Sequence, residues 1–285
     1  MGGAGGDRGR GVLGVRAGAV RRAGRFVATG LLVLRLVSGA VVADGGNMQQ
    51  VAGIDGCRSG WVVVRRDVTG GAPKVQVVPG LREVISDPSL AVVAIDVPIG
   101  LLDGAVPGGR PCDVAARRML APRRASSVFS APVRGVLGAT SYAQAAACSR
   151  ASSPHTLALS QQSFAILPKI AEVDDLVTPD LQDRVVEVHP ECCFAEMNGG
   201  EGLAERKKSR EGRTARLALL CEHWAPGVDL VELVEGHRSR GVQRDDVVDA
   251  MVACWTAERV RAGTARKLTE VGSIDGRGLR MEIWV

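Results

Sequence analysis

Aromatic residues are scarce in this chain of 285 residues, in which Phe, Trp and Tyr together make up 3%. The core must therefore rest on Val, Leu, Ile and Ala. The chain is 46% hydrophobic and 24% charged, which is ordinary for a globular protein. The scarcity of aromatics also disfavours a single-strand binder that stacks successive bases on an aromatic platform.

Metal-binding cysteine pairs are also missing. The chain has seven cysteines, none of which forms a C-x-x-C pair, so the spacing of a zinc finger is absent. The odd count and the adjacent Cys192 and Cys193 disfavour a disulfide framework. We therefore expect reduced, mostly buried thiols in a cytoplasmic protein. With only four histidines, the sequence shows no Ser-His-Asp order, no nucleophile elbow and no phosphate-binding P-loop.

The excess of positive charge is confined to the N-terminal segment. The net charge is +5, and residues 1–47 hold seven Arg against two Asp, which accounts for all of it. The rest of the chain is neutral and lacks the overall basic signature of a nucleic-acid-binding domain. A local basic patch can still serve that purpose, so nucleic acid stays open as a partner.

Residues 1–47 differ in composition from the rest of the chain. They are rich in Gly and Arg, and an apolar segment at 26–43 follows basic residues in the manner of a signal peptide. Arg35 interrupts that segment, which is short for a membrane span. We interpret residues 1–47 as a disordered extension, or as one upstream of a natural start at Met48, in preference to a secretory signal. Residues 48–285 then form one domain, and no stable membrane association is expected.

Short apolar runs between Gly and Pro residues predict the strands. They lie at 51–55, 61–66, 74–78, 91–96 and 184–189. The first three are joined by turns and predict an antiparallel meander. Helices are predicted at 81–85, 112–120, 141–148, 160–177 with an interruption at Pro168, 203–224 and from Asp245 onward, and a hairpin-like strand at 274–284 closes the chain. Residues 99–180 are then a helical insertion between two strands.

Acidic residues recur where the apolar strands end. Asp55 follows the first strand and Asp96 the fourth, and a carboxylate at the end of a buried strand is costly unless it is paired, hydrogen-bonded or bound to a cation. Two neighbouring parallel strands would place these two acids side by side. Glu187 lies inside the next strand and Glu191 just past its end, so either is a candidate third acid.

The last long helix adds two further acids. Asp246 and Asp249 are three residues apart and hence share one face. An alternative is that Asp245 or Asp246 caps the helix and interacts favourably with its dipole. Capping explains one of these acids well but leaves Asp249 unexplained.

Clustered carboxylates without His or Cys favour Mg²⁺ or Mn²⁺ over zinc. Two such ions clamp the attacking and leaving oxygens in phosphodiester hydrolysis. The predicted metal ligands and catalytic residues are therefore Asp55, Asp96, Glu187, Asp246 and Asp249.

Hydroxyl and basic side chains suited to phosphate lie in the region of the helical insertion. The loop at 126–134 contains Ser127 and Arg134, and Lys169 follows Pro168. With Arg58 in the first glycine-rich turn, these are the candidate substrate contacts. The charged run at 205–211 is interpreted as a solvated helix face rather than a contact to a polyanion.

Several short motifs together resemble a known family. They are Gly53-Ile-Asp-Gly-Cys-Arg58, Gly60-Trp61, Ile95-Asp-Val-Pro-Ile-Gly-Leu101, Ser127-Val-Phe129, Pro168-Lys-Ile170, Glu187-Val-His-Pro-Glu191 and Asp245-Asp246 with Asp249-Ala250. In this combination the chain resembles the domain-of-unknown-function 429 family of predicted ribonuclease H-like nucleases. The Asp-x-x-Asp-Ala run is also similar to that of the Holliday-junction resolvases. Ser59 departs from the family pattern, where a Gly is expected.

The resemblance implies an α/β fold of the ribonuclease H-like type. That fold has a mixed five-stranded sheet flanked by helices, here with the helical insertion. It also implies two-metal hydrolysis of nucleic acid. One alternative is a ribonuclease H-like phosphotransferase or ATPase, which needs a second domain and a second glycine-rich phosphate loop that the sequence lacks. The other is a non-catalytic ribonuclease H-like binding module.

Overall fold

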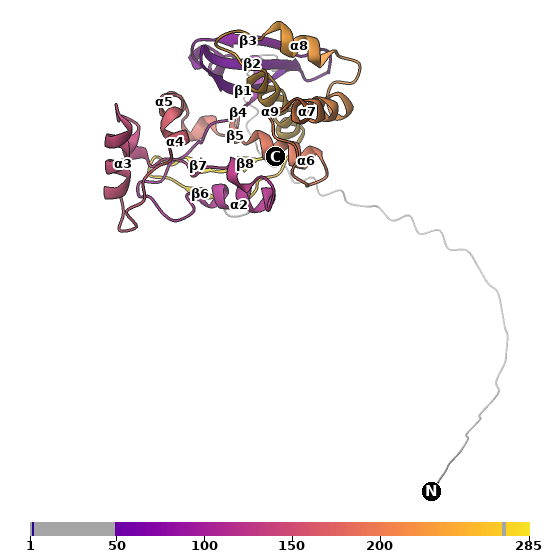
Figure 1. Ribbon diagram of the computed structural model, residues 1–285. Helices are drawn as coiled ribbons and strands as arrows, with labels where there is room; N and C mark the ends of the chain where they lie inside the picture. Colours follow the sequence, from indigo (N-terminus) through magenta and orange to yellow (C-terminus); the bar gives the residue numbers. More distant parts are fainter. Residues whose placement is uncertain (1, 3–48, 270–271) are drawn as a thin grey trace, which may run out of the picture. The chain divides into compact units, whose positions relative to one another are not determined.

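The structure is a computed structural model that describes residue 2, residues 49–269 and residues 272–285 (Figure 1). Our interpretation of residues 1–47 as an extension, and of Met48 as a start, concerns residues that lie outside this description, apart from residue 2.

A mixed sheet forms the centre of the molecule. Its strands are β1 Gln50–Cys57, β2 Gly60–Asp67, β3 Lys74–Val78, β4 Leu90–Ile95, β5 Val185–Val188 and β8 Ile283–Trp284. Across the sheet they lie in the order β3, β2, β1, β4, β5 and β8. The pairs β1–β4, β4–β5 and β5–β8 are parallel, and the pairs β1–β2 and β2–β3 are antiparallel. The predicted meander and α/β class are confirmed.

The predicted number of five strands is wrong by one. The segment expected to form a single terminal hairpin divides into β6, Ser273–Ile274, β7, Arg280–Met281, and β8. The strands β6 and β7 pair with each other, while β8 adds to the edge of the main sheet beside β5. Each of these strands has only two residues, too few to show an alternating pattern in the sequence.

Helices surround the sheet and fill the predicted insertion. They are α1 Arg82–Ile85, α2 Pro111–Leu120, α3 Tyr142–Ala151, α4 Gln161–Ala165, α5 Leu167–Leu176, α6 Pro190–Met197, α7 Arg210–His223, α8 Leu230–Gly236 and α9 Arg244–Ala262. The insertion at 99–180 holds α2 to α5, as predicted. The break expected at Pro168 falls at Ile166 instead, because the proline occupies the first turn of α5, where its missing N–H costs nothing.

The helix expected at 203–224 starts later than predicted. Its first residue is Arg210, because the Ser209 side chain accepts a hydrogen bond from the Gly212 backbone N–H at 3.0 Å and caps the helix there. Residues 203–208 therefore form no regular helix. The interpretation of their charges as one solvated helix face is therefore wrong. Lys207 lies in a loop instead, and its side chain reaches Asp249.

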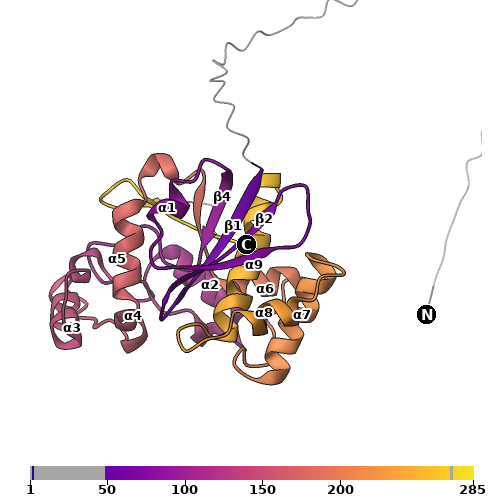
Figure 2. The same cartoon turned by 90° about the horizontal axis from the view of Figure 1, so that it is seen from above.

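Side chains alternate along the strands and build a core on each face of the sheet. On one face Val62, Val92 and Ala94 pack with residues of α6, α7 and α9. On the other, Ile54 and Ile95 pack with residues of α1 and α5. Figure 2 shows α9, α6, α7 and α8 on one side of β1, β2 and β4, with α1 and α5 on the other. The result is a three-layer arrangement of helices, sheet and helices.

Gly53 lets α9 approach β1 closely. A Cβ atom at this position would lie 2.0 Å from the Cys254 backbone nitrogen and 2.2 Å from the Ala250 carbonyl oxygen. No side chain fits there, so the helix backbone rests directly on the strand. This contact fixes the position of the first turns of α9 relative to the end of β1.

We expect Gly53→Ala to lower the free energy of unfolding by about 1–3 kcal/mol or more, because the added methyl group overpacks the strand–helix contact. Urea unfolding measures the change. The control is Gly138→Ala, where an added Cβ meets no atom within 4 Å and stability is expected to stay level or rise slightly. A Gly53→Ala variant as stable as the wild type would contradict the close packing of α9 on β1.

All seven cysteines are free, and five of them are buried. The expectation of free and mostly buried thiols is therefore confirmed. In the described part of the chain, no helix combines the length and apolarity needed to cross a bilayer.

Candidate metal centre

The parallel pairing of β1 and β4 brings Asp55 and Asp96 together. Ile54 and Ile95 are direct partners in the register, and the Asp96 backbone N–H donates to the Ile54 carbonyl oxygen at 2.9 Å. Because both isoleucines point to the α1 and α5 face, the acids that follow them point to the α9 face. The predicted adjacency of the two strand-end acids is therefore found.

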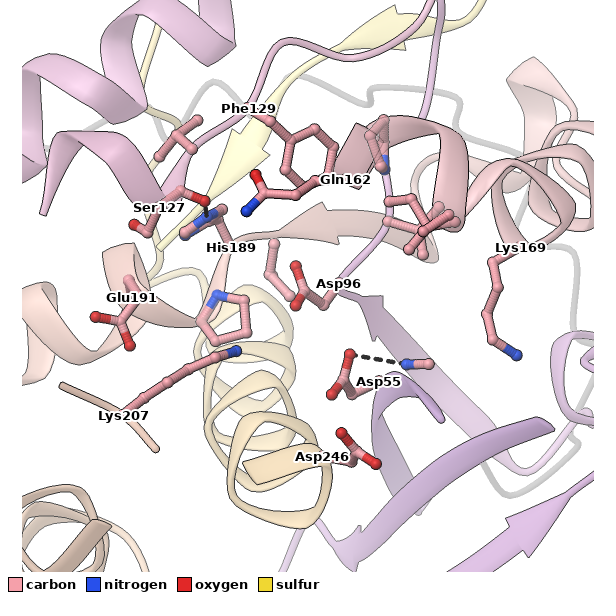
Figure 3. Close-up of a pocket in the computed structure, with 18 of the residues that line it drawn as sticks. Asp55, Asp96, Ser127, Phe129, Gln162, Lys169, His189, Glu191, Lys207 and Asp246 are labelled. Atoms are coloured by element: carbon pink, nitrogen blue, oxygen red, sulfur yellow. Dashed lines mark hydrogen bonds between the residues drawn. The ribbon is translucent and has the colours of Figure 1, made fainter. Parts of the chain in front are cut away.

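Asp249 completes a group of three carboxylates. It lies in the second turn of α9, the helix that rests on Gly53. One carboxylate oxygen each from Asp55, Asp96 and Asp249 lie within 4.8 Å of one another. Figure 3 shows Asp55 and Asp96 pointing into the same pocket. The three acids therefore come from two strand ends and one helix.

The hydrogen bonds of this group leave carboxylate oxygens unused. Asp55 Oδ1 accepts the Gly56 backbone N–H at 2.7 Å, and Asp249 Oδ2 accepts from Lys207 Nζ at 2.7 Å. The other Asp249 oxygen, Oδ1, is buried and has no hydrogen-bond partner within the described residues. A buried carboxylate oxygen without a partner is costly, and a bound cation would remove that cost.

Burial raises the pKa values of all three acids, and the charges of neighbouring acids raise them further. For Asp96, burial and then the charge of Asp249 raise the pKa to about 8. Burial and the charges of Asp96 and Asp249 raise the pKa of Asp55 well above its ordinary value, and burial raises that of Asp249. The Lys207 ammonium acts in the opposite direction on each of them. One lysine thus compensates only part of the negative charge.

Asp246 lies at the edge of this group and also caps α9. Its Oδ2 accepts the Gln243 backbone N–H at 2.8 Å, as in a capping box. Burial, followed by the charges of Asp245 and Asp249, raises its pKa to about 6. It is not one of the three acids whose oxygens converge, although Figure 3 shows its side chain beside Asp55. Asp246 therefore contributes to the cap from the third position of α9, whereas the N-cap residue itself is Gln243. A ligand role would use its second oxygen.

Glu187 lies on the face of the sheet opposite to that of Asp55, Asp96 and Asp249. It pairs in register with Ile95 rather than with Asp96, so its side chain points away from α9. Its two oxygens accept from Arg110 at 2.6 and 2.8 Å, and one also accepts the Ile99 backbone N–H at 2.7 Å. The predicted metal-ligand role of Glu187 is therefore not supported by its surroundings.

Glu191, the other candidate, is paired as well. Arg216 donates to both of its oxygens at 2.7 and 2.8 Å, and Arg124 donates at 3.0 Å. These bonds lower the pKa of Glu191 despite its burial. The residue lines the same pocket as the three acids, with its charge already compensated.

Three of the four predicted substrate contacts line the pocket. It has a volume of about 940 Å³, and Arg58, Ser127 and Lys169 are part of its wall. Lys169 lies over the Trp61 ring, with Nζ 4.3 Å from the ring centre. Arg134 is not among the lining residues, and its guanidinium forms ion pairs with Asp174 in the insertion and with Asp275 between β6 and β7. The structure therefore does not bring Arg134 together with the other three candidate contacts.

Sequence similarity assigns the chain to a family. A family model described as "Protein of unknown function (DUF429)" matches residues 53–271, about three quarters of the chain. The chain belongs to the DUF429 family. No curated protein and no solved structure matches it. Asp55, Asp96 and Asp249 all lie within the matched DUF429 region, which also covers the pocket residues named above.

The donor atoms of Asp55, Asp96 and Asp249 are of a kind that can hold a divalent cation. They are carboxylate oxygens alone, without His or Cys, which is the donor set that Mg²⁺ and Mn²⁺ prefer. The buried Asp249 Oδ1 is a donor that no group of the described chain uses. The three residues therefore fit such an ion.

Lys207 is the site residue that sequence reasoning missed. Lys207 belongs to the charged run at 205–211, and nothing in that run distinguishes it from its neighbours Arg206 and Lys208. Its proximity to Asp249 depends on the loop that ends at the Ser209 cap. A signal was available in Ser209, a residue type that favours the N-cap position, followed by the acidic Glu211 in the first turn.

Proposed function

We propose that this DUF429 protein is a divalent-metal-dependent nuclease that hydrolyses phosphodiester bonds in nucleic acid. The observation that carries the proposal is the convergence of Asp55, Asp96 and Asp249, with the buried Asp249 Oδ1 lacking a partner. A ribonuclease H-like fold is part of the proposal. The antiparallel β1–β2–β3 meander, the parallel β4 and the acidic helix α9 support it.

Asp55, Asp96 and Asp249 would hold Mg²⁺ or Mn²⁺, with Asp246 as a further ligand through its second oxygen. A divalent cation bound there supplies Lewis-acid stabilisation of the charge that develops on the phosphate. The protein itself contributes the alignment of these acids, because β1, β4 and α9 are held by backbone contacts rather than by loops. Such rigid placement favours catalysis by orientation.

Basic side chains flank the acids and are suited to the substrate phosphates. Figure 3 shows Lys207 on one side of Asp55 and Asp96 and Lys169 on the other. With Arg58, they place positive charge along the pocket of a domain that is neutral overall. We expect these residues to bind the phosphates on either side of the bond that is cleaved.

We expect millimolar Mn²⁺ or Mg²⁺ to raise the melting temperature, because the cation relieves repulsion among the three acids. At a concentration of about 100 times the dissociation constant, the gain is about 2.7 kcal/mol. Thermal melts with metal, compared with NaCl at matched ionic strength, measure it. An unchanged midpoint together with silent titration calorimetry would contradict the metal site.

Cleavage of labelled DNA and RNA oligonucleotides with Mn²⁺, and its loss on adding a chelator, tests the activity. Binding of oligonucleotides without cleavage under any metal would instead favour the non-catalytic module. Hydrolysis of ATP without cleavage would favour the phosphotransferase or ATPase.

A further inference from the structure

Phe129 presents an aromatic ring to the pocket without packing into the core. It is half-buried and lines the pocket. Three hydrophobic clusters form the core of the described chain, and Phe129 belongs to none of them, although its neighbour Val128 belongs to the first. Phe164, in contrast, packs edge-to-face on Tyr142. A flat apolar ring that no core residue covers is available for stacking with a ligand.

Gln162 lies on the same side of the pocket. It follows the first residue of α4, and its amide forms no hydrogen bond with another described residue. Figure 3 shows Phe129 and Gln162 together beyond Asp96, on the side away from Asp246. A carboxamide offers a donor and an acceptor side by side, which is the arrangement that reads the edge of a nucleobase.

His189 adds a polar atom without a partner. Its Nε2 faces the Ser127 carbonyl oxygen at 3.4 Å, and Nδ1 is buried with no hydrogen-bond partner in the described chain. A carbonyl accepts only, so we assign the proton to Nε2, which leaves Nδ1 as an acceptor. Burial lowers the pKa of His189 and favours this neutral form. His189 lines the pocket with Phe129 and Gln162.

We propose that Phe129, Gln162 and His189 form a base-binding subsite, which takes one unpaired nucleobase of a single-stranded nucleic acid. The proposal rests on the proposed function for the nature of the substrate. Stacking on Phe129 and edge contacts to Gln162 would position the nucleotide whose phosphate lies at the Asp55–Asp96–Asp249 group. A base inside a duplex is covered on both faces, so it reaches such a ring only when unpaired.

The size and composition of the pocket agree with this role. Its volume of about 940 Å³ lies within the range of small-molecule sites, roughly 300–1,000 Å³, so a nucleotide fits. The scarcity of aromatics disfavours a platform for successive bases but is compatible with a single ring for a single base. The predicted substrate is therefore single-stranded, with one base position that matters more than the others.

An abasic scan tests the subsite. Binding of a short labelled single strand is measured by fluorescence anisotropy in Ca²⁺, with gels confirming that the strand stays intact. The base is removed at one position at a time. We expect one position to weaken binding to the wild type by about 5- to 100-fold, as stacking on one aromatic ring does. Phe129→Ala should bind the intact strand more weakly by a similar factor and no longer respond to that position.

Two further variants separate stacking from folding. Phe129→Trp should restore both the affinity and the sensitivity to the abasic position. Trp255→Leu is the control, because Trp255 is a half-buried aromatic outside the pocket with Arg259 over its ring, and it should bind like the wild type. Identical abasic profiles for wild type and Phe129→Ala would overturn the subsite. The subsite would also be overturned if a blunt duplex bound as tightly as the single strand, or if no nucleic-acid strand bound at all.

The failure of this proposal can be told from failure of the proposed function. A protein that cleaves nucleic acid but shows no Phe129-dependent abasic position has the activity without the subsite. A protein that never cleaves but keeps that position in its binding profile has the subsite without the activity.

Discussion

Replacing Asp96 by Asn is expected to reduce phosphodiester cleavage strongly and, at the same time, to make the metal-free protein more stable at pH 8. Asp96 accepts no hydrogen bond from the described residues and faces two other acids. Asn keeps the shape of the side chain but removes the charge. The loss of a ligand should lower activity by about 100-fold or more, because metal ligation contributes several kcal/mol to transition-state stabilisation.

The effect on stability has a defined pH dependence. Burial and neighbouring acids raise the pKa of Asp96 from 3.8 to about 8 in the folded state. Between these values the folded protein holds a proton that the unfolded chain has lost, so stability falls as the pH rises. One pKa unit corresponds to about 1.4 kcal/mol. Asp96→Asn cannot ionise and should match the wild type near pH 4, then exceed it by a few kcal/mol at pH 8.

Urea unfolding in a chelator at both pH values, together with cleavage assays in Mn²⁺, measures the two effects. The control is Asp245→Asn, which removes an acid from the first turn of the same helix but not from the converging group. It should leave cleavage within a few-fold of the wild type. A stability difference that is the same at pH 4 and pH 8, or an activity that survives in Asp96→Asn, would contradict the assignment.

The sequence allowed the acidic group to be anticipated because its members lie on regular elements. Asp55 and Asp96 end apolar strands, and the parallel pairing of such strands aligns their ends. The Asp246 and Asp249 spacing fixes a shared helix face. The face of the sheet on which Glu187 lies could also have been predicted from the sequence. Val186 and Val188 face the α9 core, so strict alternation places Glu187 on the opposite face.

Contacts made by loops could not be anticipated in the same way. Whether Lys207 meets Asp249 depends on where α7 starts, and whether Arg134 meets phosphate or Asp174 depends on how the insertion folds. Neither follows from local periodicity. Phe129 is a similar case, because its freedom from core packing is defined by residues far away in the sequence. Local patterns thus predicted the converging acids better than the groups around them.

Loss of Arg110 should strongly destabilise the fold. Its guanidinium is buried and donates to Glu187 at 2.6 and 2.8 Å and to Asp113 at 2.7 and 3.1 Å. It also donates to the carbonyl oxygens of Ile99 and Gly100 at 3.0 and 3.1 Å. One cation therefore compensates two buried carboxylates and holds the segment after β4 against α2 and β5.

We expect Arg110→Met to lower the free energy of unfolding by about 3–5 kcal/mol, because it leaves Glu187 and Asp113 buried without their partner. Urea unfolding measures it. The control is Arg244→Met, which breaks the more exposed ion pair with Glu235 and should cost about 1 kcal/mol or less. Similar losses in both variants would contradict a special role for the buried pair.

The same network decides whether Glu187 belongs to the metal site. Glu187→Gln keeps the side-chain shape and removes the charge that Arg110 compensates, so stability should fall. The Mn²⁺ affinity should remain within a few-fold of the wild type, since Glu187 lies on the other face of the sheet from Asp96. Titration calorimetry on Glu187→Gln and Asp249→Asn compares the two cases. If Glu187→Gln reduced the Mn²⁺ affinity as strongly as Asp249→Asn does, Glu187 would be a metal ligand. That result would contradict the interpretation that Glu187 serves only to pair with Arg110.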